Sequence, residues 1–236
     1  MNRLSLVLIS SVAFIFAACG DDSSVTSPSE KVSLSTMTDS RDGQTYKTVT
    51  IGSQTWLAEN LNYKTDNSYC YDDKASNCSK YGRLYTWAAA MDSAGKWSTN
   101  GNGCGYGSEC SPAGRVRGVC PSGWHLPTKA EFNTLFSTVG GQSTAGKMLK
   151  STSGWTNSYG ESSGNGTDAY SFSALSAGDR GYKGDYTYEG HGTQFWSSTE
   201  FYSNYAYGMS LCYFEGKATL PINYKNNGFS VRCIKD

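Results

Sequence analysis

Hydrophobic and polar positions divide the chain into three stretches with different patterns. Residues 4–16 are apolar apart from serines, residues 20–30 are small, polar and acidic, and from Arg41 onward aromatic, glycine and aliphatic residues alternate. The polar stretch offers too little apolar surface to offset the entropy that a chain loses on ordering. We therefore expect a signal segment at 1–18, a flexible tether rich in Ser, Asp and Thr at 19–40, and one folded domain at 41–236.

Strand patterns are spread over the folded region. Residues 46–51 alternate between apolar and polar side chains, and residues 54–57 follow after a Gly-Ser turn, which predicts a hairpin. Further strands are expected at 172–175, 195–198, 205–214, just after the turn at 215–216, and 229–234, with a long glycine-rich excursion at 178–192.

A first helical pattern lies upstream of a long loop. Residues 82–94 place Leu84, Trp87 and Met91 at the spacing of one helix face. Residues 98–118 are dominated by glycine, serine, asparagine and proline, which predicts a loop rather than a regular element.

A second helical pattern has clear start and stop signals. Thr128 stands three residues before Glu131, the spacing of a capping box in which the two side chains satisfy each other's exposed backbone donors. Apolar residues follow at helical intervals from Phe132, and Gly140 and Gly141 end the pattern. The whole pattern predicts an α+β domain with two helices, strands near both ends and long loops.

The apolar start has the three zones of an export signal. Arg3 supplies a positive charge, an apolar run follows, and two alanines precede Cys19. The run is too short to span a bilayer, which takes roughly 20 apolar residues. Residues 16–19 also resemble a bacterial lipobox, which implies cleavage before Cys19 and a lipid on its thiol; an ordinary secretory signal is the alternative. Acyl chains would hold the protein at a membrane, and Gly20 favours the outer membrane by resemblance to enterobacterial sorting.

Charge and composition exclude one class of partner. Twenty basic and twenty acidic residues cancel, whereas a protein that binds nucleic acid carries a basic patch or stripe. The 17 tyrosines and 27 glycines instead are typical of an exported domain rich in strands and loops. We therefore expect no nucleic-acid partner.

Seven cysteines besides Cys19 should pair in an oxidising compartment. Short polar or glycine-rich loops suggest two pairs, Cys70 with Cys78 and Cys104 with Cys110, although sequence alone does not fix connectivity. We pair Cys120 with Cys233, because both belong to segments expected to enter the core. That choice leaves Cys212 free, either as a small buried hydrophobe or as a reactive thiol. No pair of Cys-x-x-Cys knuckles exists, so we expect no metal and no cofactor.

Five blocks of sequence carry a family resemblance. In order, they are residues 46–62, 82–87, 120–128, 195–200 and 228–233. Together these blocks resemble the Fibrobacter succinogenes major paralogous domain, and the resemblance covers nearly everything after Arg41. It implies an exported or cell-surface bacterial domain, often lipid-anchored.

A more distant resemblance concerns the fold. Residues 124–128 before the capped helix and residues 228–232 near the end are similar to the C-type-lectin-like fold shared with formylglycine-generating enzymes. This likeness implies two helices, paired terminal strands and a long functional loop region. The enzymes use a closely spaced cysteine pair near their last strands, whereas here Cys212 stands alone before Cys233. The catalytic residues therefore do not carry over. His125 and His191 lie in no recognisable triad, so we expect no catalytic residue and no enzyme.

The loops between residues 156 and 207 supply the candidate binding surface. Their acidic residues lack the spacing of a calcium-binding loop, which favours solvated side chains over a calcium site. Aromatic faces offer sugar rings a large contact area at low entropic cost, although packing against strands is the alternative for these tyrosines. The ligand-binding candidates are Tyr182, Tyr186, Tyr188, Tyr202 and Tyr205.

Two functions follow from these observations. The first is a lipid-anchored, surface-exposed module of the outer membrane that binds polysaccharide or a surface protein. The second is a structural or assembly component of the cell envelope without catalytic activity.

Overall fold

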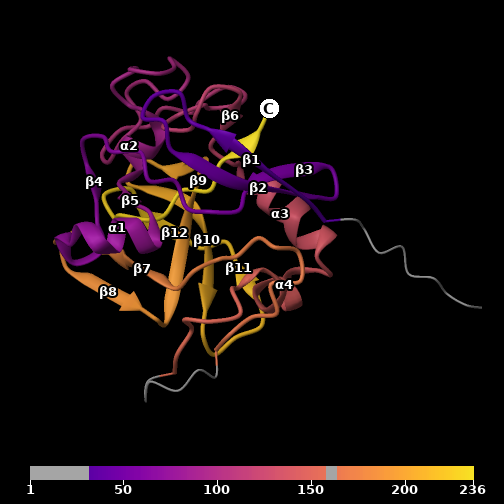
Figure 1. Ribbon diagram of the computed structural model, residues 1–236. Helices are drawn as coiled ribbons and strands as arrows, with labels where there is room; N and C mark the ends of the chain where they lie inside the picture. The colour runs from indigo at the N-terminus through magenta and orange to yellow at the C-terminus, as the bar shows by residue number, and fades with distance from the viewer. Residues whose placement is uncertain (1–31, 158–163) are drawn as a thin grey trace, which may run out of the picture.

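A computed structural model describes residues 32–157 and 164–236, which fold around two β-sheets flanked by short helices (Figure 1). The signal segment, Cys19 and most of the predicted tether lie outside the described residues, so cleavage and lipidation stay predictions. Within the described residues, no helix is both long enough and apolar enough to cross a membrane.

The first sheet joins the N-terminal strands to the C-terminal end of the chain. Its order is β1-β2-β3-β13-β6, and all of its pairs are antiparallel. The strands are β1 (Ser33–Thr38), β2 (Thr45–Ile51), β3 (Gln54–Leu57), β13 (Ile234–Lys235) and β6 (Trp124–His125). The predicted hairpin is present as β2 and β3, which turn at Gly52 and Ser53.

Strand β1 corrects the predicted tether. Residues 33–38 were expected to belong to the flexible segment, but they pair with β2 over six residues, from Ser33 opposite Thr50 to Thr38 opposite Thr45. Four of the six residues of β1 are serine or threonine, and the strand buries almost nothing, which suits an exposed edge strand but hid it from the sequence analysis. The folded part therefore begins before Arg41.

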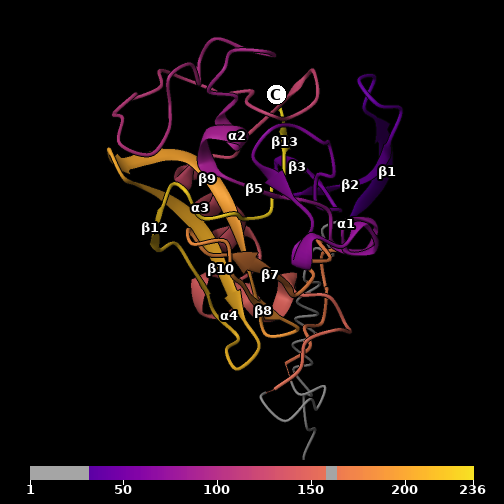
Figure 2. The same ribbon diagram turned by 90° about the vertical axis from the view of Figure 1, so that its left-hand side faces the viewer.

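The second sheet is larger and curled. It runs β11-β10-β9-β7-β8, and β12 also pairs with β10. The strands are β7 (Ala177–Arg180), β8 (Tyr186–Glu189), β9 (Gly192–Tyr202), β10 (Tyr205–Cys212), β11 (Ala218–Thr219) and β12 (Ile222–Tyr224). Figure 2 shows β9 and β10 as the longest, curved ribbons of the molecule. Residues 178–192 were expected to form a long glycine-rich loop. They instead contain most of the β7–β8 hairpin.

Two other predicted strands are less regular than expected. In the segment 172–175 only Ala174 makes a bridge, to Lys150. In the segment 229–234, Phe229 and Ser230 make isolated bridges before the regular strand β13. A further two-stranded sheet pairs β4 (Ser68–Tyr69) with β5 (Leu84–Tyr85).

Four α-helices, rather than two, occur among the described residues. They are α1 (Ala75–Tyr81), α2 (Trp87–Met91), α3 (Lys129–Thr138) and α4 (Gln142–Leu149), preceded by a 3₁₀ turn at Tyr71–Asp73. Helix α3 has the predicted capping box between Thr128 and Glu131.

The other helices depart from the prediction for local reasons. Helix α2 begins only at Trp87, because the preceding residues form β5, and Thr86 caps it by accepting a hydrogen bond from the Ala89 backbone. Helix α1 has a largely polar sequence that gives no apolar period. Helix α4 starts immediately after Gly141, which the sequence presents as a stop signal.

The core consists of two clusters separated by the second sheet. Neighbouring residues on β9 point to opposite sides, so Phe195 belongs to one cluster and Trp196 to the other. On the Phe195 side, Trp56 stacks on Phe132 of α3 with ring centroids 5.6 Å apart. On the Trp196 side, the ring centroid lies 4.3 Å from that of Phe229.

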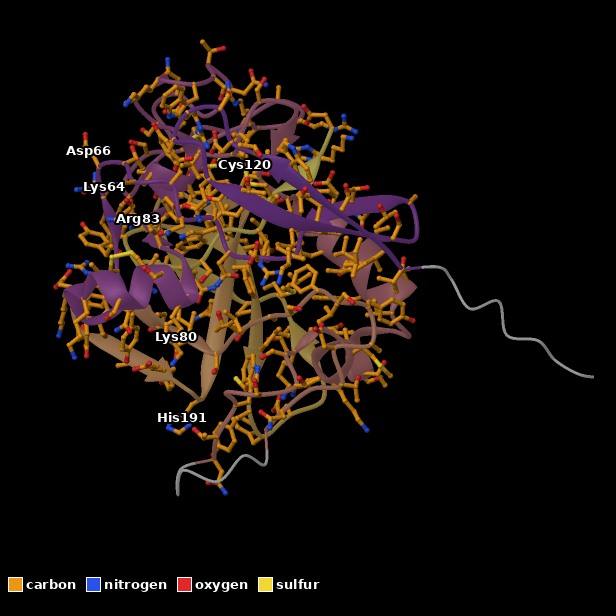
Figure 3. All side chains as sticks on the ribbon, in the orientation of Figure 1. Lys64, Asp66, Lys80, Arg83, Cys120 and His191 are labelled. Atoms are coloured by element: carbon orange, nitrogen blue, oxygen red, sulfur yellow. A yellow bond between two sulfur atoms is a disulfide. The ribbon has the colours of Figure 1, made fainter. Side chains whose placement is uncertain are left out.

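Three disulfides cross-link the described residues. They join Cys70 to Cys78, Cys104 to Cys110 and Cys120 to Cys233, the pairs given in the sequence analysis, and Cys212 is a free thiol. The Cys120–Cys233 bond lies in the core and links the segment before β6 to the segment before β13. Figure 3 marks the position of Cys120 among the packed side chains.

Candidate functional site

A row of exposed aromatic side chains lies at the tip of the second sheet, where β9 turns into β10. Only Ser203 and Asn204 separate the two strands, so Tyr202 and Tyr205 face each other across the turn. On its other side Tyr205 is paired with Tyr224 of β12. The sheet register therefore collects tyrosines from three strands in one place.

Ring contacts divide this row into two groups of three, which meet where Tyr202 pairs with Tyr205 across the turn. Tyr224 lies 4.7 Å from Tyr205 and 5.6 Å from Tyr182, measured between ring centroids. Phe201 lies 4.5 Å from Tyr202 and 5.5 Å from Tyr207. We call the set the tyrosine stripe: Tyr182, Phe201, Tyr202, Tyr205, Tyr207 and Tyr224.

Much of the stripe faces solvent. Tyr202 is 60% exposed, Tyr182 54% and Tyr224 40%. Period-2 alternation explains the position of β10 side chains, because Ala206 is buried in the core between Tyr205 and Tyr207. The ammonium of Lys129 lies 3.7 Å from the Tyr207 ring centroid and places a cation at this end of the stripe.

A cleft of about 450 Å³ adjoins the stripe. Its lining combines aromatic, hydroxyl and carboxyl groups from residues Glu109, Ser111, Pro112, Gly114, Thr128, Ser198, Thr199, Glu200, Phe201 and Tyr202. Small-molecule sites combine apolar walls with a few placed polar groups in this way.

Glu200 holds the loop that walls this cleft. Its carboxylate accepts hydrogen bonds from the backbone N–H groups of Cys110, at 3.1 and 3.2 Å, and Ser111, at 2.9 Å. It also pairs with the ammonium of Lys225 at 2.5 Å, and that ammonium donates to the Ser108 carbonyl at 2.7 Å. Burial alone would raise the pKa of Glu200, but the bonds from Lys225 and from the two N–H groups lower it. Glu200 is therefore a charged clamp and not an acid available for proton transfer.

Two further features fix the loop of residues 98–118, to which Cys110 and Ser111 belong. The carboxylate of Asp92, at the end of α2, accepts hydrogen bonds from the backbone N–H groups of residues 96, 97 and 98. Gly118 has a φ of +57°, and a Cβ there would lie 2.1 Å from the Ala90 carbonyl oxygen. Only glycine allows the returning chain to lie this close to α2.

The five tyrosines predicted as ligand candidates separate into three places. Tyr182, Tyr202 and Tyr205 belong to the stripe. Tyr186 instead packs on Tyr71 and donates a hydrogen bond to Asp73 at 2.7 Å. Tyr188 is 62% exposed but lies in the lining of a different cleft, at the other end of β9.

Sequence reasoning missed half of the stripe. Tyr207 lies within the strand predicted at 205–214, where the alternation around Ala206 was a usable signal, whereas Phe201 falls between the strands predicted at 195–198 and 205–214. Tyr224 joins the stripe only through the pairing of β12 with β10, which no local pattern reveals.

The second cleft, of about 340 Å³, contains the free thiol. Cys212 is half-buried, and burial raises the pKa of its thiol, so the thiol stays protonated at neutral pH. Because a protonated thiol is a poor nucleophile, the structure favours the packing role of Cys212.

Two other polar groups line the same cleft. His191, labelled in Figure 3, forms a 2.8 Å hydrogen bond through Nδ1 with the Thr156 carbonyl. Burial raises the pKa of Asp179, despite hydrogen bonds from Thr187 and Gln194.

His125 has a structural environment. It is 1% exposed, and its ring nitrogens lie 2.7 Å from Asp236 Oδ1 and 2.9 Å from Glu131 Oε1. Glu131 also belongs to the capping box of α3, so the histidine joins the helix start to the C-terminus. Within residues 32–157 and 164–236, no group of three or more His, Cys, Asp and Glu side chains could hold a metal ion.

Comparison with known proteins identifies the family. The model of the Fibrobacter succinogenes major domain matches residues 49–235, so the chain belongs to that family. Comparisons with curated proteins and with solved structures give no match.

Proposed function

We propose that this member of the Fibrobacter succinogenes major domain family is a lipid-anchored, surface-exposed module that binds polysaccharide through the tyrosine stripe. One observation carries the proposal: six aromatic side chains from separate segments gather beside a polar cleft as two groups of touching rings, and four of the six are exposed. The anchor at Cys19 and the outer-membrane location rest on the sequence of residues 1–20.

The chemistry of the stripe suits sugars. Tyrosine rings present flat apolar faces to the C–H faces of a sugar, and their hydroxyls hydrogen-bond at the edges. They lose little conformational entropy on binding, because a tyrosine has few rotatable bonds. The cleft beside them adds hydroxyl groups from Ser111, Ser198 and Thr199.

The charges near the stripe favour a neutral polysaccharide. Glu200 is already paired with Lys225, and Glu109 on the rim of the cleft is exposed. A charged polymer of either sign would meet a like charge, from the Glu109 carboxylate or from the Lys129 ammonium beside Tyr207, and like charges repel. Neutral plant cell-wall polymers such as cellulose and neutral xylan are therefore the first candidates.

We also infer a C-type-lectin-like arrangement of the domain. The inference is supported by the pairing of C-terminal strand β13 with β3 and by the capped helix α3 that follows β6. The stripe and the loop of residues 97–118 would then correspond to the functional loop region that this fold implies.

A pull-down on insoluble polysaccharides tests the function. The mature chain carrying Cys19→Ser, which is soluble without its lipid, is mixed with cellulose, neutral xylan and an acidic pectin. We expect retention on a neutral polymer and its loss in Tyr202→Ala. Tyr188→Ala is the matched control, because Tyr188 is equally exposed but lies outside the stripe. Retention on no polymer, or equal loss in both variants, contradicts the proposal.

Protease shaving of intact cells tests the location. Digestion of the domain in whole cells is expected for a surface protein, and protection would place it inside the envelope. Crosslinking in the same cells distinguishes the assembly component, which should capture one fixed protein neighbour in the absence of polysaccharide.

A further inference from the structure

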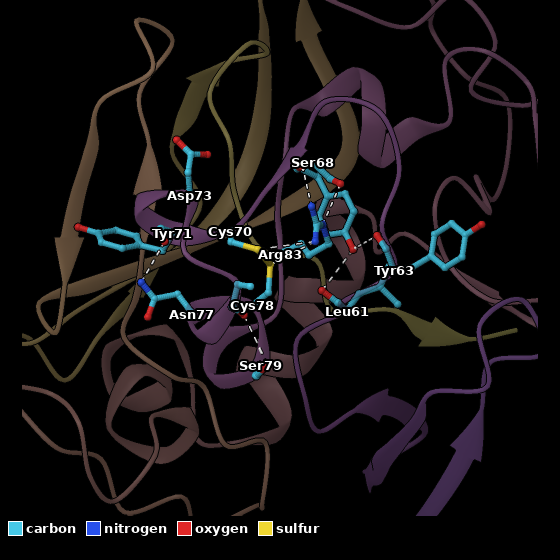
Figure 4. The surroundings of a disulfide bond; sticks show 12 residues. Leu61, Tyr63, Ser68, Cys70, Tyr71, Asp73, Asn77, Cys78, Ser79 and Arg83 are labelled. Atoms are coloured by element: carbon cyan, nitrogen blue, oxygen red, sulfur yellow. Dashed lines mark hydrogen bonds between the residues drawn. A yellow bond between two sulfur atoms is a disulfide. The ribbon is translucent and has the colours of Figure 1, made fainter.

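A guanidinium group lies directly against the disulfide between Cys70 and Cys78 (Figure 4). Nη1 of Arg83 lies 3.3 Å from the Cys78 sulfur and 3.7 Å from the Cys70 sulfur. Two hydrogen bonds to Ser68, each 3.0 Å long, fix the guanidinium: Nε donates to the hydroxyl and Nη2 to the carbonyl. The cation is therefore held in place at the sulfur atoms.

This cation is not neutralised by a carboxylate. Arg83 forms no ion pair with any described residue. In the surrounding segment, Lys74 pairs with Asp72 at 3.2 Å and Lys80 with Glu189 at 3.9 Å, while Asp73 accepts a hydrogen bond from Tyr186. The unpaired positive charge that faces the sulfur atoms is that of Arg83.

The Cys104–Cys110 disulfide gives a close comparison with the opposite charge. Both bonds close short loops, with sequence separations of 8 and 6, and each joins one buried cysteine to one that is partly exposed. However, the group beside the Cys110 sulfur is the Glu200 carboxylate, at 3.7 Å. The third disulfide, Cys120–Cys233, is fully buried.

We propose that Cys70–Cys78 is a thiol-exchange site, which an external dithiol, small or protein-borne, opens before the other two disulfides. A thiolate is stabilised by a neighbouring cation, and exchange is faster when the leaving thiol has a lower pKa. Cys78, 7% exposed and in contact with Arg83, is suited to leave, while the more exposed Cys70 is suited to be attacked.

The exchange balances as a two-electron transfer. A thiolate of the dithiol attacks Cys70 Sγ, the Cys70–Cys78 bond breaks, and Cys78 leaves with the bonding electrons as a thiolate beside Arg83. The second thiol of the reagent, after losing its proton, attacks the mixed disulfide and releases Cys70, which takes up a proton. The dithiol is oxidised to a disulfide and the protein disulfide is reduced.

Opening this bond would release a segment that packs against β8. Tyr81 donates a hydrogen bond to Glu189 at 2.9 Å, and Tyr71 packs on Tyr186 at 5.3 Å between ring centroids. Neither contact involves a residue of the tyrosine stripe, and the inference does not depend on polysaccharide binding.

Timed reduction tests the order of opening. The oxidised mature chain is treated with dithiothreitol, quenched with iodoacetamide at intervals, and mapped by peptide mass spectrometry. We expect Cys70 and Cys78 to be alkylated first, and Arg83→Gln to slow that step about tenfold. Arg83→Lys, which keeps a cation, should retain part of the rate. Opening of Cys104–Cys110 first, or one common rate for all three bonds, overturns the proposal.

A second measurement does not require an Arg83 variant. In a background that carries Cys19→Ser and Cys212→Ala, Cys70→Ser leaves Cys78 as a single free thiol, and Cys104→Ser leaves Cys110. The pH dependence of alkylation gives each thiol pKa. The value for Cys78 should lie below the ordinary cysteine value of about 8.5, and the value for Cys110 should lie above that of Cys78. An equal or reversed order overturns the proposal.

Discussion

The two ends of the β9–β10 ribbon expose aromatic side chains to a similar extent but organise them differently. At the tip, Tyr202 is 60% exposed and belongs to a row of touching rings, beside a loop that a buried charge pair clamps. At the base, Tyr188 is 62% and Phe214 66% exposed. Phe214 belongs to a shorter row, because its ring centroid lies 5.2 Å from that of Tyr213, which in turn lies 5.5 Å from that of His191.

The comparison teaches that exposure alone does not mark a binding surface. The six rings at the tip offer an extended polymer more contacts at once than the three touching rings at the base, and a single exposed aromatic residue such as Tyr188 is ordinary on a protein surface. The tip also carries the carboxylate whose pKa is lowered, and the base carries one whose pKa is raised. The pKa shifts of the two carboxyl groups therefore have opposite directions, which experiments can separate.

The largest effect should come from breaking the clamp at the tip. Lys225 is fully buried, so Lys225→Ala leaves the Glu200 carboxylate without its partner. Removing one member of a buried pair costs about 3–5 kcal/mol of unfolding free energy, and urea denaturation measures it. The control is Lys217→Ala, whose exposed pair with Glu215 should contribute less than about 1 kcal/mol. A similar small loss of unfolding free energy in both variants would contradict a stabilising role of the Glu200–Lys225 pair.

The next largest effect concerns binding itself. Tyr205→Ala combined with Tyr224→Ala removes two touching rings from the stripe and should weaken binding by about 2–3 kcal/mol, or roughly 100-fold. Tyr188→Ala combined with Phe214→Ala removes two rings at the base that are more exposed than Tyr205 and Tyr224, and it should leave affinity unchanged. Affinity electrophoresis in gels that contain soluble polysaccharide compares the two double variants, because binding retards the protein. Equal retardation of both variants would contradict the claim that the tip, and not the base, binds polysaccharide.

Acid should weaken the tip first. Glu200 has a lowered pKa in the folded protein, because hydrogen bonds from Lys225 and the loop outweigh the effect of burial. Its stabilising contribution is present above the unfolded pKa of about 4.3 and is lost as the pH falls through the folded value. The unfolding free energy should therefore decrease in acid, and Glu200→Gln should flatten that decrease. Glu109→Gln, at an exposed position, should leave the slope unchanged.

The smallest effect is expected at the base and has the opposite sign. Burial raises the pKa of Asp179, so its ionisation at neutral pH opposes folding. Asp179→Asn keeps a carbonyl acceptor for the hydroxyl of Thr187 and should stabilise the protein by less than about 1 kcal/mol at pH 7. The gain should disappear at low pH, where the carboxyl is protonated. A clear destabilisation at pH 7 would show that the charged form is needed.

Local signals determined which parts of the fold could be predicted. Helix α3 follows from Thr128 and Glu131, which lie within one helical turn, and the β2–β3 hairpin follows from a two-residue turn. Helix α1 could not be predicted, because it buries only Cys78 and Tyr81 and has no apolar period. Strand β1 was missed because an exposed edge strand needs no hydrophobic residues.

The candidate site depends on long-range pairing and was only half predictable. Tyrosine abundance identifies the region between 182 and 205, but it does not distinguish Tyr186, which packs on Tyr71, from Tyr182, which joins the stripe. Tyr224 takes its place through its register with Tyr205. Likewise, the contact between Glu200 and residues 110–111 spans about ninety positions, so no local pattern could reveal the clamp.

Nuclear magnetic resonance of the aromatic rings tests the central claim most directly. The mature chain is labelled with ¹³C at tyrosine and phenylalanine and titrated with neutral oligosaccharides derived from cellulose and xylan. Saturable shifts of the Tyr202, Tyr205 and Tyr224 rings, with no shift of Tyr188 or Phe214, are the result that polysaccharide binding at the stripe predicts. Shifts confined to the base, or none at any ring, would contradict it.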